Sequence, residues 1–224
     1  MLQELDKILL GDNVAEEFRK KYNDQEFRSW VNSILPEVED CRKLVQDNPW
    51  HIYNCLDHIL YSVDSMNKQT LDFDNKTRKM LAYTMFLHDI GKPECKIRRY
   101  SKLYKREVDS FFGHNKAGVK IANRVLPMLG FESSQSDQIK ALIEYHDMFM
   151  FLTLENDGNH YHRVLSNKVI DDQVNKFNNV GDGKRLMEYL IMVGRADNLA
   201  QNPQMTGESL HLIDVMEDML EMDR

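Results

Sequence analysis

The feature of this 224-residue sequence that most constrains its fold is a helical repeat of apolar residues. From residue 52 to 63 apolar side chains recur at the i, i+3, i+4, i+7 spacing of one helix face, and His58 lies in that stripe. Residues 77–89 are apolar on nearly all sides, as expected of a helix at the centre of a bundle, and Gly91 and Pro93 follow. The pattern predicts an all-α helical bundle.

Further helices are predicted on both sides of this pair, and the low content of Pro (5) and Gly (10) argues against a turn-rich β architecture. We expect them within 1–50 and at 113–129, 133–146, 184–200 and 208–224. Residues 92–106 are expected to form a basic loop, and 148–182 a covering segment. No repeat or linker divides the chain. The predicted organisation is therefore peripheral N-terminal helices (1–35), a main domain (36–202) and an amphipathic C-terminal helix packed on it (203–224).

Charge and cysteine content exclude several classes of protein. The formal net charge of −7 argues against an extended nucleic-acid-binding surface. Three cysteines without a CxxC pair argue against a disulfide framework and a thiolate zinc site, which fits a reducing cytoplasm. The N-terminus lacks the apolar core of a signal peptide, and no stretch approaches about 18 apolar residues. We therefore expect a cytoplasmic protein without a membrane partner.

Six titratable residues lie on, or at the ends of, the apolar helix faces: His58, His88, Asp89, His114, His146 and Asp197. A single buried histidine is more often a hydrogen-bonded core residue than a metal ligand. Burying all six without partners would cost several kcal/mol, and their best common partner is a cation. Imidazoles and carboxylates without thiolates suit Fe, Mn, Ni or Mg better than Zn. Adjacent residues can share an ion only where the chain leaves the regular helix, and Gly91 is expected to supply that break.

These residues resemble the HD-domain phosphohydrolases, a superfamily with a histidine, a later His-Asp doublet and a distal aspartate. The strongest similarity is to the HD domain of bacterial tRNA nucleotidyltransferases, where segments similar to five segments of this chain occur in the same order. These segments are NPWHIYNCLDHIL, LHDIGKP, GHNKAGV, IEYHD and RADNLAQ. The nucleotide-transferring head of those enzymes is absent, so CCA addition is not predicted. The additional motifs of guanosine tetraphosphate hydrolases and of cyclic-di-GMP phosphodiesterases are also missing.

The resemblance implies an all-α HD-domain bundle over residues 36–202 and one or two divalent ions. In two-metal members, the residues matching His58, His88, Asp89 and Asp197 hold one ion, and Asp89 bridges to a second ion. His114 and His146 would hold that second ion, with a hydroxide between the two ions as nucleophile. In one-metal members the latter pair binds the phosphate or gives a proton to the leaving oxygen. Both histidines fall on inward stripes, which favours two ions.

A basic run follows the doublet and supplies candidates for substrate binding. Lys92, in the IGKP turn, is expected to bind phosphate, and Arg98 and Arg99 are weaker candidates that could equally belong to a solvated loop. We therefore assign catalytic roles to Asp89, Lys92 and His114. His51 could support the centre by contacting a residue that reaches the metal, although packing is the commoner role for such a residue.

The resemblance predicts a phosphohydrolase that acts on a phosphomonoester, a cyclic phosphodiester or a nucleotide, with RNA ends or small nucleotides as the leading substrates. The alternative is a non-catalytic module in which the metal braces the bundle and the pocket senses a nucleotide or docks a partner. A more remote alternative is the diiron oxygenase branch of the wider fold. The sequence does not specify an oligomeric state.

Overall fold

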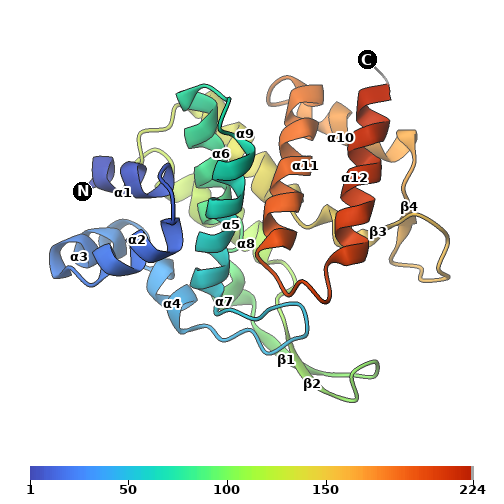
Figure 1. The fold of residues 1–224 in the computed structure, drawn as a ribbon, viewed down its shortest axis with the longest axis horizontal. Helices are drawn as coiled ribbons and strands as arrows, with labels where there is room; N and C mark the ends of the chain where they lie inside the picture. Colours follow the sequence, from blue (N-terminus) through green and yellow to red (C-terminus); the bar gives the residue numbers. More distant parts are fainter. Residues whose placement is uncertain (223–224) are drawn as a thin grey trace.

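The structure is a computed structural model that describes residues 1–222, and helices form most of it (Figure 1). The helices are α1 (Leu2–Leu9), α2 (Val14–Tyr22), α3 (Gln25–Ile34), α4 (Glu37–Lys43), α5 (Cys55–Gln69), α6 (Asn75–Leu87), α7 (Lys92–Cys95), α8 (His114–Val125), α9 (Ser133–Tyr145), the 3-10 helix η1 (Met148–Phe151), α10 (Asn167–Phe177), α11 (Gly183–Leu199) and α12 (Gly207–Met222). The all-α prediction is confirmed. The last two residues of the predicted C-terminal helix lie outside the described residues. Among residues 1–222, none of the helices combines the length and the apolar composition of a membrane-spanning segment.

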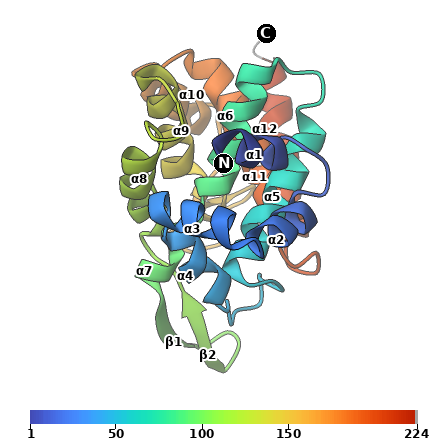
Figure 2. The same ribbon diagram turned by 90° about the vertical axis from the view of Figure 1, so that its left-hand side faces the viewer.

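Helices α5 and α6 form the centre of the bundle. Every residue from Met80 to Leu87 is buried, as the continuous apolar run predicts, and α6 packs against α1, α5, α9 and α11. Asp74 begins α6 by accepting hydrogen bonds from two backbone N–H groups of its first turn. Figure 1 places α1–α3 on one side of this pair and α11 and α12 on the other, and Figure 2 shows α8, α9 and α10 on a further side.

The N-terminal helices contribute to the same core as the rest of the bundle. Phe18 and Phe27 are fully buried, and α2 packs on α5. Asp64 of α5 accepts a hydrogen bond of 2.6 Å from the backbone N–H of Val14 at the start of α2. The division of the chain into 1–35, 36–202 and 203–224 stays a prediction.

The first central helix begins later than its apolar stripe indicates. Asn54 accepts a hydrogen bond from Asp57 N and starts α5 at Cys55. Ile52 lies before the helix and is 55% exposed, so its inclusion in the buried stripe was wrong. A match to the helical period by a single residue upstream of a cap carries little information about burial.

The predicted basic loop is instead a short helix followed by a β-hairpin. After α7, strands β1 (Ile97–Ser101) and β2 (Arg106–Ser110) pair antiparallel, with Ile97 opposite Ser110. The hairpin projects from one end of the bundle (Figures 1 and 2). Nearly all of β1 is exposed, so the strand has no apolar alternation from which it could have been predicted. The segment 148–182 contains η1, α10 and a two-residue parallel pair, β3 (Leu152–Thr153) with β4 (Arg163–Val164).

Candidate metal centre

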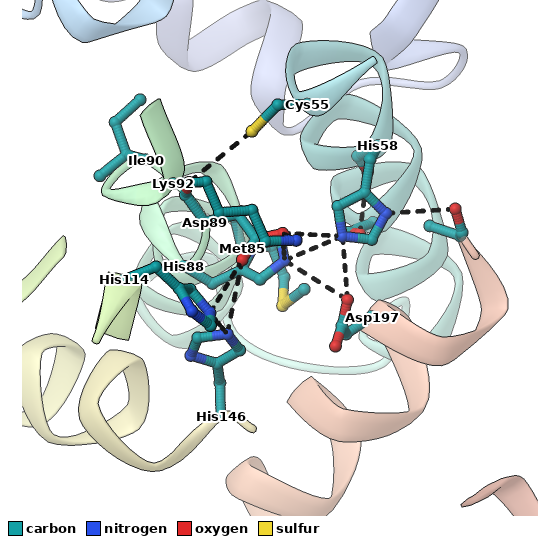
Figure 3. Close-up of polar contacts among 12 residues, drawn as sticks. Cys55, His58, Met85, His88, Asp89, Ile90, Lys92, His114, His146 and Asp197 are labelled. Atoms are coloured by element: carbon teal, nitrogen blue, oxygen red, sulfur yellow. Dashed lines mark hydrogen bonds and ion pairs between the residues drawn. The ribbon is translucent and has the colours of Figure 1, made fainter. Parts of the chain in front are cut away.

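The six predicted ligands converge on one point inside the bundle, and each comes from the end of a helix or the turn next to it (Figure 3). They are His58 in the first turns of α5, His88 at the C-cap of α6, Asp89 directly after it, His114 at the start of α8, His146 at the C-cap of α9 and Asp197 in the last turn of α11. Helix ends allow side chains from five elements to meet, because the chain turns away from the centre at those points.

The His88-Asp89 doublet lies where α6 gives way to a tight turn. Ile90 N donates to Leu87 O over 3.3 Å and Lys92 N donates to Asp89 O over 3.0 Å, so regular helical bonding has ended. The expected break at this point is therefore present, but its reason differs from the expected one. Gly91 has an ordinary φ of −82°, and a Cβ there would lie 2.3 Å from His114 O. Gly91 is needed because α8 packs directly against it.

Four of the ligands form a first group, consisting of His58, His88, Asp89 and Asp197. One ligand atom from each lies within 4.8 Å of the others. His58 Nε2 is 3.1 Å from Asp89 Oδ2 and 2.9 Å from Asp197 Oδ1. His88 Nε2 is 3.4 Å and 3.5 Å from the same two oxygens. Two imidazoles and two carboxylates thus face one small volume.

Asp89, His114 and His146 form a second group that shares the same carboxylate. Asp89 Oδ1 lies 3.2 Å from His114 Nε2 and 3.6 Å from His146 Nε2. The other oxygen, Oδ2, is the one that faces the first group. The two oxygens of a single buried side chain therefore point to two different sets of nitrogens, which is the arrangement of a bridging carboxylate.

Each imidazole is held through its far nitrogen by a backbone carbonyl. The Nδ1 atoms of His88, His114 and His146 lie 2.6, 2.8 and 2.7 Å from the carbonyl oxygens three residues before them. His58 Nδ1 lies 3.2 Å from Ala200 O. A carbonyl only accepts, so each Nδ1 carries a proton and each neutral ring directs the Nε2 lone pair inward. This is how metal-binding histidines are oriented.

The inward lone pairs need a positive charge between them. His58 Nε2 and His88 Nε2 are 3.3 Å apart, and His114 Nε2 and His146 Nε2 are 3.1 Å apart. Two neutral acceptors at such distances repel each other, so a proton or a metal ion must lie at each place. Asp89 Oδ2 is buried and, apart from its ion pair with Lys92, makes no well-oriented hydrogen bond, so it keeps lone pairs for an ion. The donor set therefore fits one or two divalent ions.

Charge interactions set the protonation states of these groups. Burial lowers the pKa of His88, but the neighbouring Asp89 and Asp197 carboxylates outweigh it and raise that pKa to about 10. Burial raises the pKa of Asp89, but the charge of Lys92 and the interaction with His88 hold it well below its usual range. The centre thus attracts cations, and a metal ion would replace the histidine protons.

Lys92 reaches the centre and is itself held from the other side. Its Nζ lies 2.5 Å from Asp89 Oδ2 and donates to Gln46 Oε1 over 3.0 Å and to His51 Nε2 over 3.1 Å. His51 accepts because its Nδ1–H donates to Asn48 Oδ1 over 2.8 Å, and burial with the Lys92 charge keeps its pKa well below the usual value. His51 lies in the segment before α5, and no pattern in the sequence indicated Gln46.

Other predicted residues lie apart from the two groups. Arg98 pairs with Asp47 at 2.7 Å and Asp109 at 3.1 Å at the root of the hairpin, and Arg99 lies over the Phe112 ring at 4.5 Å. Phosphate binding by these two arginines stays a prediction. One residue that supports the centre was missed. Gln201, just beyond the end of α11, donates through Nε2 to Asp197 Oδ1 over 3.1 Å, and its i+4 spacing from Asp197 could have identified it.

Comparison with known proteins gives a distant relationship. No family-level description matches the chain. Two similar proteins are the bifunctional uridylyltransferase/uridylyl-removing enzymes of Cereibacter sphaeroides and Ruegeria pomeroyi, each 22% identical over 142 residues. These matches cover 57% of this chain, but only 13% and 14% of the respective relatives. The chain is therefore distantly similar to a small part of enzymes with a uridylyl-removing activity, and its buried His/Asp groups could hold metal.

Proposed function

We propose that this chain is a metal-dependent phosphohydrolase of the HD-domain type that hydrolyses a phosphate ester, and that Asp89 would supply a ligand to each of two divalent ions. The substrate is a phosphomonoester, a cyclic phosphodiester or a nucleotide. The observation that carries this proposal is the placement of Asp89, whose two carboxylate oxygens face separate groups of imidazole nitrogens. Paired ions about 3.5–4 Å apart are the usual centre for phosphate-ester hydrolysis.

The chain would supply the ligands, and the ions would supply the chemistry. His58, His88, Asp89 and Asp197 would hold the first ion, and Asp89, His114 and His146 would hold the second. A divalent ion lowers the pKa of water from 15.7 towards about 7 and neutralises the charge that develops on the phosphate. The mixed nitrogen and oxygen donors favour Fe, Mn, Ni or Mg over Zn.

Lys92 supplies a fixed positive charge beside the ions. Burial lowers its pKa, but Asp89 outweighs that effect and holds the pKa above the usual value, so the ammonium stays charged. Gln46 and His51 restrict its position. We assign it to the phosphate oxygens of the substrate, where a fixed cation stabilises the transition state.

The names of the relatives support a phosphodiester as one substrate. Removal of a uridylyl group is the hydrolysis of a phosphodiester that links uridine 5′-phosphate to another group. The present chain corresponds to only 13–14% of those enzymes, so their names support this part of the proposal together with the chemistry of the centre. A cyclic nucleotide or an RNA end offers the same type of bond.

A screen of metals and esters tests the proposal. The full chain, loaded in turn with Mn²⁺, Fe²⁺, Ni²⁺ and Mg²⁺, is assayed with nucleoside monophosphates, 2′,3′-cyclic nucleotides and dinucleotides. We expect turnover that is lost on chelation and restored by metal. Stoichiometric metal binding without turnover of any ester would instead favour a non-catalytic, metal-braced module, an alternative that the nearly complete burial of His58, His88 and Asp89 makes worth testing.

Lys92→Met separates the role of the lysine from that of the ions. The variant keeps the length and apolar stem of the side chain but loses the charge. We expect turnover to fall about tenfold to a hundredfold while the metal content stays unchanged. Lys96→Met is the matched control, because Lys96 pairs with Asp109 at the hairpin root and should leave turnover near the wild-type value.

A further inference from the structure

An exposed tryptophan lies next to the metal centre in the chain. Trp50 is 40% exposed and precedes His51, which touches Lys92. The ring centroid of His51 is 5.2 Å from that of the ligand His58. Consecutive Cα atoms are about 3.8 Å apart, so Trp50 stands one residue from the groups that reach the centre. Part of a large aromatic ring is therefore left uncovered one residue away from His51.

The backbone around Trp50 is held by hydrogen bonds to the segment that follows α11. Its carbonyl accepts a hydrogen bond of 2.8 Å from Asn202 N, and Pro49 O accepts one of 2.8 Å from Asn202 Nδ2. Asn202 follows the ligand Asp197 by five residues. The loop that carries Trp50 thus leads into α5 and is bonded to the segment after α11, and these are two of the three helices that supply the first ligand group. A ring held this way binds a ligand without the entropic cost of ordering a loop.

The hairpin places a second aromatic ring against the first. The centroids of Trp50 and Tyr104 are 5.7 Å apart and their planes are 87° apart, which is an edge-to-face contact. In such a contact one ring covers part of one face of the other and keeps its own faces clear of that partner. The pair therefore remains able to stack with a flat ligand.

Two lysines close to Tyr104 in the sequence have no carboxylate partner in the part of the chain that the structure describes. The cations at the hairpin root are paired, since Lys96 and Arg98 bind Asp109 and Arg106 binds Asp47. Lys102 and Lys105 are exposed near the turn, and within residues 1–222 neither makes an ion pair. A chain of net charge −7 thus presents unpaired positive charge beside its exposed aromatic pair.

We propose that Trp50 and Tyr104, with Lys102 and Lys105, form a nucleobase platform that makes this centre act on nucleotidyl esters. The inference rests on the proposed function and names its substrate class. The base stacks on the Trp50 ring, and the lysines attract the anionic ligand. Stacking of this kind tolerates different bases, because every base has a π-face, and cations nearby add to it. The platform therefore selects nucleotides over other phosphate esters more strongly than one base over another.

Fluorescence quenching tests the platform without relying on turnover. The chain has two tryptophans, so the Trp30→Phe variant leaves Trp50 as the sole reporter. The full metal-loaded chain is titrated with adenosine 5′-monophosphate and with ribose 5-phosphate, which has the same sugar and phosphate but no base. We expect saturable quenching by the nucleotide and about tenfold weaker binding of the sugar phosphate.

Substitutions at the platform complete the test, with binding followed by calorimetry. Trp50→Ala should weaken nucleotide binding about tenfold and leave ribose 5-phosphate binding unchanged, and Trp50→Phe should restore most of the difference. Tyr161→Ala, at another exposed aromatic residue, is the control. Equal binding of the two ligands by wild type and Trp50→Ala would overturn the platform, even if the protein hydrolyses phosphate esters. Base-dependent quenching without hydrolysis of any ester would retain the platform and defeat the proposed function.

Discussion

Asp89 and Asp109 are both buried carboxylates with a lowered pKa, but their surroundings differ in kind. Asp109 Oδ2 accepts hydrogen bonds from Asp47 N and lies 2.9 Å from Lys96 Nζ, and Oδ1 accepts from Arg98 at 3.1 Å. Its bonding capacity is met by donors of the protein itself. Such a carboxylate fixes structure, here by attaching the hairpin to the segment before α5.

Among residues 1–222, Asp89 has one fixed cation near it, Lys92, and it otherwise faces histidine nitrogens whose opposite sides are already bonded to carbonyls. Those nitrogens are acceptors unless they are protonated. Asp89 and its neighbours are thus left with more acceptors than donors. The comparison teaches that burial and a low pKa alone do not identify a functional carboxylate, whereas an excess of converging lone pairs does.

The largest effect is expected at the shared carboxylate. Asp89→Asn replaces an anionic bridge with a neutral amide, so both ions lose a ligand and turnover should fall by at least about a thousandfold. Metal content, measured by elemental analysis, should fall with it. Asp109→Asn should keep both metal and turnover. Wild-type turnover in Asp89→Asn would remove the basis for distinguishing the two carboxylates.

The second prediction distinguishes the contributions of the two ligand groups to metal binding. His58→Ala removes a ligand of the first group only, and His146→Ala a ligand of the second only. Each should weaken one ion by more than about a hundredfold, since even indirect partners of a ligand contribute tenfold to a hundredfold. Calorimetric titration of the metal-free protein should show one remaining strong equivalent in His146→Ala. Loss of both equivalents there would contradict a centre made of two groups.

Asp109 should control acid stability instead of metal binding. Burial raises its pKa, but Lys96, the Asp47 N–H and Arg98 together lower it. The folded pKa lies below the unfolded value of about 3.9, so the stabilisation is present above that pH and is lost as the pH falls through the folded pKa. The free energy of unfolding of Asp109→Asn should be about 2 kcal/mol lower than that of the wild type near pH 7. The difference between the two proteins should become smaller below pH 4.

Denaturant unfolding across pH 2–7 measures this effect. The exposed Asp171→Asn variant is the matched control and should follow the wild-type curve, because Asp171 lies on the surface of α10. An Asp109→Asn curve parallel to the wild type throughout the acid range would show that the carboxylate makes no net contribution to the folded state.

The smallest effect is expected at Gln201. Gln201→Ala removes the donor that orients Asp197 and should weaken the first ion about tenfold while leaving the second unchanged. The readout is the same metal titration, and Gln204→Ala, on the exposed loop that follows, is the control. An equal effect on both ions would mean that Gln201 acts on the bundle as a whole.

The helical period predicted the central part of this molecule well. His58 and Asp197 were placed inward by their neighbours at i+1 to i+4, and the structure brings them together with the doublet and the two later histidines. Burial on a helix depends on local spacing, which a single sequence displays. The meeting of helix ends from five elements was expected from the cost of burying these titratable side chains without a common cation and from the resemblance, since periodicity says nothing about which ends are adjacent.

The β-hairpin and the residues that contact it could not be predicted from the periodicity of the sequence. Strand β1 is mostly exposed, and Asp47 and Asp109 are 62 residues apart with no common pattern. Gln46 likewise meets Lys92 through folding alone. Contacts between an irregular segment and a remote turn produce no periodic pattern of residues. The platform around Trp50 could therefore not be predicted from the sequence either.

Three imidazoles of the centre are anchored by the turn of chain immediately before them, each to the carbonyl three residues earlier. The hydrogen bond that fixes the tautomer of each ring is therefore made to a nearby backbone carbonyl, and every residue has such a carbonyl. Replacement of packing residues elsewhere can alter the bundle without rotating these rings. A centre whose histidines are each oriented by the residues just before them can persist through extensive sequence divergence, provided that the distances between the helix ends are preserved.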